Sequence, residues 1–569
     1  MQGISRTDRD LWDAGEVAGH LLPEGSVFAF LAEHRRELFP DEFTADLFPS
    51  RTGRPSLPAD LVGSVLVLKE LHDLSDPQTA DALKYDLRWK IACGRSLLET
   101  SFDPSTLVYW RKRIAASDRP HRVFDAVAEV IAATGILRGK RKRCVDSTVF
   151  DDAVATQDTV TQLTAAMRKV SRAVPGAAAV IAEACTLDYG KAGKPDIDWD
   201  DPQAKERLVS DLVNDALAVL DALAGPGAPQ RDAAAADALG LLALVAGQDV
   251  EPAEDSDGTD GRWRIARKVA PDRVISTVDT EARHTRKSKS SRRDGFRAHV
   301  AAEPETGLVT GCEMTMAAGQ GSTDAENGVK MARRDRFAAG SADPGGEGGA
   351  GSGNSAGTGQ APQDGAGSGG TAGAAESTGA GDGPQAGGLE IYGDSAYGTG
   401  EARAGYRDAG LGTVIKPGPL RPAVPGGFTI DDFTIDEDNG TVTCPAGVTR
   451  TMSARRNVIF GAACAGCPLR DRCTTAKDGR SMSIHPHEEL LRAARAQART
   501  SEFKEKYPTR SAIERVIAWT ATRNGRRIRL RYLGTAKNDA WLHTRCAAIN
   551  LRTLLRHGLT RSEEAWALA

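Results

Sequence analysis

The sequence lacks an apolar segment that would direct the chain into a membrane or out of the cell. Its first ten residues contain no apolar core for a signal peptide, and the apolar run at 239–246 is too short to span a bilayer. Cysteine is scarce, and nine thiols without a secretory signal are an odd number that indicates reduced cysteines. These absences predict a soluble, cytoplasmic protein.

The sequence also lacks an excess of positive charge, since its formal net charge is −4 at pH 7. This average conceals an uneven distribution. Acidic residues are concentrated at 196–221 and 251–260, whereas basic residues are concentrated at 138–143, 283–297 and 515–537. A single basic run is often only a solvated face, but three such runs together favour a polyanionic partner.

The composition that is present is ordinary for a globular protein, with 40% apolar and 26% charged residues over 569 positions. It excludes overall disorder and allows more than one core. The exception is the segment 340–388, which is almost wholly Gly, Ala, Ser, Thr, Pro and short acids. Such a segment buries too little apolar surface to offset chain entropy, so we expect a disordered loop there rather than a domain boundary.

The N-terminal part of the chain has a helical pattern. Apolar residues recur at three- and four-residue spacing over 26–130, which predicts several short helices. We expect an all-helical domain at 1–135, in which the basic residues Arg111, Lys112 and Arg113 share one helix. This suits DNA docking of the helix-turn-helix type, and the alternative is a basic face that is simply solvated.

The remainder, 136–569, alternates between strand and helix patterns in the order of an RNase H-like α/β domain. The predicted elements are strands at 295–301, 308–314, 389–392 and 413–417, and helices at 324–333, 400–409 and 510–523. The insertions are helical at 160–265, disordered at 340–388, and β-rich with cysteines at 423–487. The sequence therefore predicts an interrupted α/β core.

Three carboxylates stand out in this predicted core. Asp146 and Asp394 each close an apolar run and precede small polar residues, as expected for side chains at strand ends. Glu514 would approach from a helix, where Arg510 lies four residues earlier on the same face and could contact a phosphate or orient the glutamate. Carboxylates on separate elements can hold two divalent ions that cut and rejoin phosphodiester bonds. Each residue alone could instead be a turn, a cap or a surface ion pair.

Four cysteines are grouped late in the chain. Cys444 is followed by Cys464, Cys467 and Cys473, which gives one pair at close spacing. Such a set fits a structural tetrahedral zinc site, and the alternative is four reduced thiols without a ligand. His299 lies in a predicted strand and is interpreted as a packed side chain rather than a base.

Several motifs resemble those of a known family. The matching positions are 53–56, 86–89, 145–148, 294–299, 305–307, 393–397, Tyr507, Arg510 and Glu514. The chain resembles bacterial insertion-sequence transposases of the DDE class, specifically the eleven-eighty-two group, related to those with a Y-x2-R-x3-E signature. The resemblance implies that Asp146, Asp394 and Glu514 bind two Mg²⁺ or Mn²⁺ ions. It also implies cleavage at the ends of an insertion sequence and transfer of those ends into target DNA.

The chain departs from this family in two places. The wider signature has a lysine seven residues after the glutamate, where this chain has Ala521, so that DNA contact is missing or displaced to Arg523. The Gly-rich insertion before Asp394 is also atypical. Neither departure removes a predicted metal ligand.

The expected partner is double-stranded DNA, both terminal inverted repeats and target, bound by a homodimer on paired ends. The expected DNA contacts are Arg111, Lys112, Arg113, Arg286, Lys287, Arg510, Arg523, Arg526 and Arg527. Two alternatives remain: a stand-alone metal-dependent nuclease, and a non-catalytic DNA-binding protein derived from a transposase.

Overall fold

The structure is a computed structural model of the 569-residue chain. It describes residues 1–5, 11–50, 52–224, 231–267, 270, 272–288, 291–338, 388–562 and 565–569, without the side chains of 287, 288 and 291. Apart from Gly388, the predicted disordered loop at 340–388 lies outside the described residues. In the part of the chain that is described, none of the helices is long and apolar enough to cross a membrane.

The N-terminal region is helical, as predicted. Its α-helices are α1 (Ala14–Ala18), α2 (Val27–Leu38), α3 (Glu42–Ala45), α4 (Ala59–His72), α5 (Asp76–Tyr85), α6 (Leu87–Ala92), α7 (Ser105–Ala115) and α8 (Arg122–Thr134). Helix α4 is buried along nearly its whole length, because neighbouring helices and the rest of the protein cover all its sides. Helix α5 begins with a capping box in which Ser75 and Gln78 each satisfy the other's backbone N–H.

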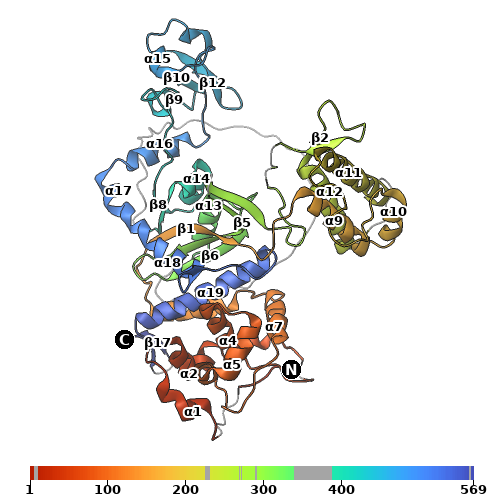
Figure 1. The fold of residues 1–569 in the computed structure, drawn as a ribbon. Coiled ribbons are helices and arrows are strands. Elements are labelled where there is room, and N and C mark those ends of the chain that lie inside the picture. Colours follow the sequence, from red (N-terminus) through yellow and green to blue (C-terminus); the bar gives the residue numbers. More distant parts are fainter. Residues whose placement is uncertain are drawn as a thin grey trace, which may run out of the picture.

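A six-stranded sheet forms the centre of the molecule (Figure 1). Its strands are β1 (Lys142–Asp151), β4 (Arg283–Ser288), β5 (Ser291–Ala302), β6 (Val309–Met316), β7 (Glu390–Gly393) and β8 (Gly412–Ile415). β5 pairs antiparallel with β1, β4 and β6, whereas β1, β7 and β8 are parallel. The predicted hairpin and the two later strands are confirmed. The order β6-β5-β1-β7-β8 in a mixed α/β structure is consistent with an RNase H-like fold.

Helices cover both faces of this sheet, and alternate residues of each strand face opposite sides. Val145, Ile391 and Ile415 pack with α13 (Asp324–Arg333) and α14 (Gly400–Asp408). Their neighbours Cys144, Tyr392 and Val414 belong to a second cluster with α18 (Ala512–Ala521) and α19 (Thr535–Arg556). This second cluster also contains the N-terminal helices, so those helices share a continuous core with the sheet.

Gly295 explains why a glycine stands in the motif at 294–299. It pairs with Asp151 on β1 and has a φ of +149°. A Cβ atom there would lie 2.1 Å from the carbonyl oxygen of Phe150, so a side chain would force β1 and β5 apart. The motif is therefore needed for close strand pairing.

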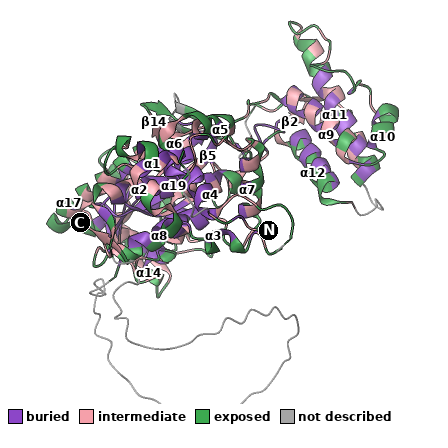
Figure 2. Cartoon of the chain, turned by 90° about the horizontal axis from the view of Figure 1, so that it is seen from below, coloured by how far each residue is buried: buried purple, intermediate pink, exposed green. Residues whose placement is uncertain are grey.

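Two smaller units extend from this body (Figure 1), and Figure 2 shows the first of them from below. The first contains α9 (Thr159–Ala173), α10 (Ala177–Ala184), α11 (Pro202–Ala224), α12 (Ala233–Gln248) and the hairpin β2 (Val250–Pro252) with β3 (Trp263–Ile265), around its own apolar core. The second holds the cysteine group, with the three-residue strands β9 (Thr434–Asp436), β10 (Thr441–Thr443), β11 (Thr449–Thr451), β12 (Asn457–Ile459) and β13 (Ser481–Ser483). It is joined to the body through α16 (Glu488–Gln497) and α17 (Ser501–Lys506).

A buried ion pair fixes β1 against the end of α13. Arg143 Nε donates to Asp335 Oδ2 over 2.6 Å, and the two side chains are 1% and 3% exposed. We expect Asp335→Ala to lower the free energy of unfolding by about 3–5 kcal/mol, because it leaves a buried guanidinium without its counter-charge. Chemical denaturation of the purified variant measures this. The exposed pair of Arg407 and Asp408 supplies the control, since Asp408→Ala should change stability by less than about 1 kcal/mol.

Candidate functional site

Asp146 and Asp394 lie at one end of the sheet because of the strand register. β1 and β7 are parallel, and Cys144 pairs with Tyr392 in their last matched pair. Each aspartate lies two residues beyond that pair, so both side chains leave the sheet on the same face. β7 ends directly before Asp394, as predicted. The expectation that Asp146 also ends a strand is wrong, because β1 continues along β5 to Asp151.

The carboxylate of Asp146 is largely buried, with 19% of the side chain exposed. Its Oδ1 accepts the backbone N–H of Ser147 over 2.8 Å, and its Oδ2 accepts from Arg510 Nη2 over 3.0 Å. Burial raises the pKa of Asp146. The N–H of Ser147 and the charge of Arg510 lower it, the negative charges of Asp394 and Asp324 raise it again, and the net shift is upward. The upward shift therefore comes mainly from burial, to which the two neighbouring aspartates add.

Asp394 uses one carboxylate oxygen in a turn. Its Oδ1 accepts the backbone N–H of Ala396 over 2.9 Å, at the start of the 3-10 turn η2 (Ser395–Tyr397). Among the described residues, its Oδ2 has no hydrogen-bond or ion-pair partner. The turn and a ligand role are thus compatible, because the second oxygen remains available.

Glu514 reaches the same face from α18, which packs on β1. Its side chain is 66% exposed, and its Oε1 lies 3.4 Å from Nη1 of Arg510. The guanidinium of Arg510 therefore bridges Asp146 and Glu514, which confirms that Arg510 and Glu514 share a face even though Arg510 lies in the 3-10 turn η5 (Tyr507–Ser511) that precedes α18.

A fourth carboxylate, Asp324, was missed by the sequence reasoning. It is the first residue of α13, and its oxygens lie 3.2 Å from Arg297 Nη1 and 3.3 Å from His299 Nδ1. These partners alternate along β5 on the α13 face, opposite to Asp146, so Asp324 serves the packing of that face. His299 is fully buried and hydrogen-bonds to Thr315, in agreement with its interpretation as a packed side chain. Two basic residues on one strand face were the signal for an acidic partner.

The basic side chains of α7 differ in how many contacts they make within the protein. Arg111 donates to both oxygens of Asp76 over 2.8 and 2.6 Å and packs on Tyr532. Arg113 donates to the hydroxyl of Tyr109 and to a backbone carbonyl. Lys112 is exposed and has no such partner in the described chain. Lys112 is therefore the member of this group that a DNA phosphate could reach without breaking an internal contact.

A basic groove of about 930 Å³ lies between the N-terminal helices and the end of β1. We call it the arginine groove. Its lining residues are His72, Asp73, Gln78, Ala153, Arg523, Asn524, Arg526, Arg527, Arg529, Leu530 and Arg531. The predicted contacts Arg523, Arg526 and Arg527 thus meet in one place. Arg286 is exposed on β4, and the side chain of Lys287 lies outside the described residues.

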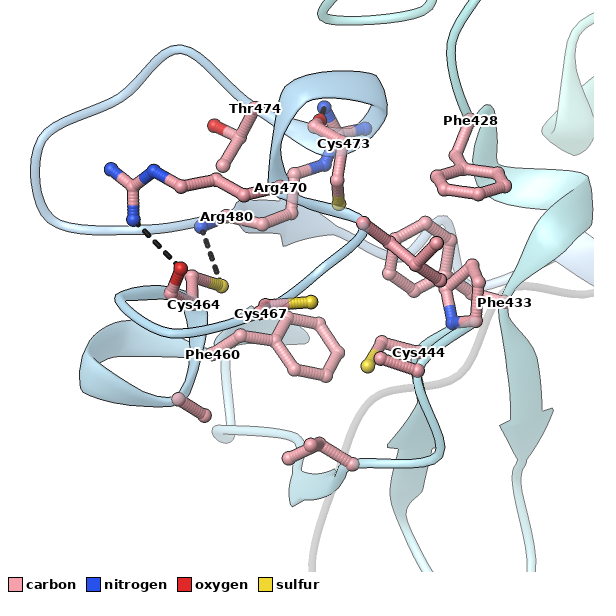
Figure 3. A pocket seen from close by; sticks show the side chains of 15 residues that line it. Phe428, Phe433, Cys444, Phe460, Cys464, Cys467, Arg470, Cys473, Thr474 and Arg480 are labelled. Atoms are coloured by element: carbon pink, nitrogen blue, oxygen red, sulfur yellow. Dashed lines mark hydrogen bonds between the residues drawn. The ribbon is translucent and has the colours of Figure 1, made fainter.

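The four grouped cysteines line one small pocket with Phe433 (Figure 3). Their sulfur atoms point toward a common space from four separate backbone positions. Burial raises the pKa of Cys473, Arg480 lowers it, and the three other thiols raise it further. The four thiols therefore line one pocket, although no three of their sulfur atoms lie within 4.8 Å of one another.

One further group has ligand atoms within 4.8 Å of one another: His121, Asp539 and His543, a candidate metal-binding set in the described residues. Asp539 Oδ2 lies 3.4 Å from His121 Nε2 and 3.3 Å from His543 Nδ1. The two imidazole rings are stacked at 3.7 Å, so their in-plane nitrogen lone pairs point side by side. The carboxylate therefore links the start of α8 to α19 as a shared ion-pair partner.

The sheet order and the paired aspartates are consistent with an RNase H-like core that carries an acidic site. Comparison with known proteins finds two matching family models. Residues 443–555 match the model described as "Transposase DDE domain", and residues 18–113 match "Transposase domain (DUF772)". The chain therefore carries the domains typical of bacterial insertion-sequence DDE transposases. The matched C-terminal segment includes Glu514 and the cysteine group.

One curated relative is an uncharacterized protein, ORF8 in the nfe locus of Rhizobium meliloti. It is 32% identical over 107 residues, which is 18% of this chain. The chain spans about half, 51%, of that relative's length. No solved structure matches this chain.

Proposed function

We propose that this protein is a DNA transposase that cleaves phosphodiester bonds at the ends of an insertion sequence and joins those ends to target DNA. The observation that carries the proposal is the register of β1 and β7, which puts Asp146 and Asp394 at equivalent positions beside the helix of Glu514. The transposase-domain matches support the choice of substrate. The activity, the DNA substrate and the homodimer on paired ends are all part of this proposal.

The three carboxylates are suited to divalent cations. Hard cations prefer carboxylate oxygens, and Asp394 lies close enough to Asp146 for its charge to act on the pKa of that carboxyl, in addition to the larger effect of burial. Asp146, Asp394 and Glu514 would hold two Mg²⁺ or Mn²⁺ ions, which would activate the attacking oxygen and stabilise the leaving oxygen. Arg510 compensates part of the charge of Asp146 and orients Glu514. Its guanidinium would lose its contact with Asp146 or with Glu514 when a cation binds.

The remaining sequence predictions extend this proposal. Residues 1–135 would bind the terminal repeats, with Lys112 as the free cation of α7. Residues 136–569 would form the catalytic part, interrupted at 160–265, 340–388 and 423–487. Cys444, Cys464, Cys467 and Cys473 would hold one structural zinc that stabilises the last insertion and takes no part in the chemistry.

The test uses the wild-type full chain with labelled DNA carrying the flanking inverted repeats of its gene, plus Mg²⁺ or Mn²⁺. We expect cleavage at the repeat ends, and strand transfer from pre-cut ends into a plasmid. Cutting without joining would favour a stand-alone nuclease. Binding without cutting on verified ends would favour a non-catalytic DNA-binding protein, and either result would sink the transposase proposal.

A further inference from the structure

The hairpin that follows α18 is built to hold a fixed shape. β14 (Thr522–Arg523) and β15 (Arg526–Arg527) are joined by two residues, Asn524 and Gly525. Both have positive φ, +48° and +76°, which is the type I′ turn that Asn-Gly sequences favour. A tight turn of this kind fixes the backbone from which the flanking side chains project, so the backbone of the hairpin is preorganised.

The hairpin is also fixed to the strand that carries Asp146. Arg527 Nη2 donates to the carbonyl of Val149 over 2.6 Å and lies 3.3 Å from the hydroxyl of Thr148. Arg529, just beyond the hairpin, donates to the carbonyl of Asp152 over 2.6 Å. These contacts begin two residues after Asp146 on β1, so the hairpin keeps a constant distance from the candidate site.

Positive charge in the arginine groove is poorly compensated. Five arginines line it against one aspartate, Asp73, which pairs with Arg531 over 2.6 Å. Arg526 is exposed and has no hydrogen-bond or ion-pair partner among the described residues. Burial and the nearby guanidinium of Arg293 lower the pKa of Arg527, and the charge of Asp151, which pairs with Arg293, opposes this shift only in part. Cations held together in this way indicate a missing anion.

The groove is shared between two regions of the chain. Arg523 Nη2 lies 3.0 Å from Nδ1 of His72 at the end of α4, and burial with nearby arginines lowers the pKa of His72 to about 4. A neutral His72 can accept a hydrogen bond from Arg523, which joins the hairpin to the N-terminal helices. An extended polyanion lying in the groove would therefore contact both regions at once.

We propose that the β14–β15 hairpin is a phosphate clamp that grips the DNA backbone at a fixed distance from the cleavage site and so sets which phosphate is cut. This inference rests on the proposed function for its substrate, DNA. Arg526 contacts a phosphate directly. Arg527 is a positioning residue that holds the hairpin on β1.

The test measures binding of the full chain to a fluorescent DNA duplex of unrelated sequence, in EDTA, over a series of salt concentrations. Arg526→Ala should weaken binding several-fold and reduce the slope of log K against log salt by about 0.9, one phosphate contact to duplex DNA. An affinity and a slope unchanged from those of the wild-type chain would overturn the clamp. Arg207→Ala on α11, which is 65% exposed and distant in the fold, is the matched control and should leave the slope unchanged.

A second variant tests the shape of the hairpin rather than its charge. Gly525→Val keeps every arginine but strains the positive φ at an exposed turn, so the fold should persist by circular dichroism. We expect it to weaken binding as much as Arg526→Ala does. If both variants bind like Arg207→Ala, the clamp is wrong. Because EDTA prevents cleavage, this assay measures binding alone. Weaker binding by both variants would support the clamp even if the wild-type chain did not cut DNA. Normal cutting by the wild-type chain with unchanged binding by both variants would reject the clamp and leave the proposed function intact.

Discussion

Replacing either Asp146 or Asp394 with asparagine is expected to slow DNA cleavage by at least about a thousand-fold. Metal ions contribute several kcal/mol to stabilising the charge that develops in phosphodiester cleavage, and about 4 kcal/mol corresponds to this factor. Asparagine keeps the size of the side chain and the turn contact to Ala396, but it lacks the charge that holds a divalent ion. The measurement is single-turnover cleavage of labelled ends in Mg²⁺.

Two comparisons make this result specific. Asp408→Asn, on the exposed end of α14, should cleave at the wild-type rate, because its carboxylate is 57% exposed and, among the described residues, pairs with Arg407 alone. Both active-site variants should still bind the ends with wild-type affinity in EDTA. Cleavage within ten-fold of wild type by Asp394→Asn would remove this residue from the proposed site.

The position of Glu514 differs from that of the two aspartates. Its side chain is mostly exposed and touches the site through Arg510. In the described chain the three carboxylates are not as close to one another as a shared ion would require, since the one group with ligand atoms within 4.8 Å is elsewhere. To share an ion with the two aspartates, Glu514 would have to turn inward, and Arg510 would have to release Asp146.

Local patterns predicted the sheet and its helices well. The helix at 324–333 coincides with α13, and the strands around Asp394 differ by one or two residues from β7 and β8. These elements have clear apolar periodicity and turn residues at their ends, which a sequence displays directly. The neighbouring positions of Asp146 and Asp394 are not visible in these local patterns, because they depend on the parallel pairing of β1 with β7.

The long helix α19 was not predicted because its buried face is partly polar. Asn550 exchanges hydrogen bonds with the backbone of Val309, and Arg545 donates to the carbonyl of Glu70. These partners lie hundreds of positions away, so the sequence shows polar residues where the fold has a core. For the same reason, Arg111 looked like a free cation although Asp76 and Tyr532 hold it.

β4 and the β14–β15 hairpin were not predicted, because their charged side chains obscure the strand pattern. The run at 283–297 was interpreted as a basic surface, although it contains β4 and the first half of β5. Arginine side chains at consecutive positions obscure a period of two, and backbone pairing with β5 stabilises the strand regardless. The arginine groove could not be derived from sequence, because it depends on where α4 meets the segment after α18.

Removal of metal is expected to unfold the cysteine-bearing unit. Its core consists of a few buried side chains, including Phe433, Val442, Val458 and Phe460, and its strands have three residues each. A core this small is rarely stable without a disulfide bond or a bound metal ion. Structural zinc sites supply about 10–16 kcal/mol of binding free energy near neutral pH, which is also folding free energy.

We therefore expect the purified chain to contain about one equivalent of zinc. Cys467→Ser or Cys473→Ser should abolish zinc binding. Cys185→Ser is the control and should retain the zinc, because Cys185 is an isolated, half-buried thiol. Proteolysis should then cut within 423–487 in the two zinc-site variants and in chelator-treated wild type. Substitution with Co²⁺ distinguishes the sites, because four thiolates give strong charge-transfer absorption whereas the set of His121, Asp539 and His543 would not. A metal-free chain that resists proteolysis would show that the four thiols are simply reduced cysteines, and that the small core is sufficient on its own.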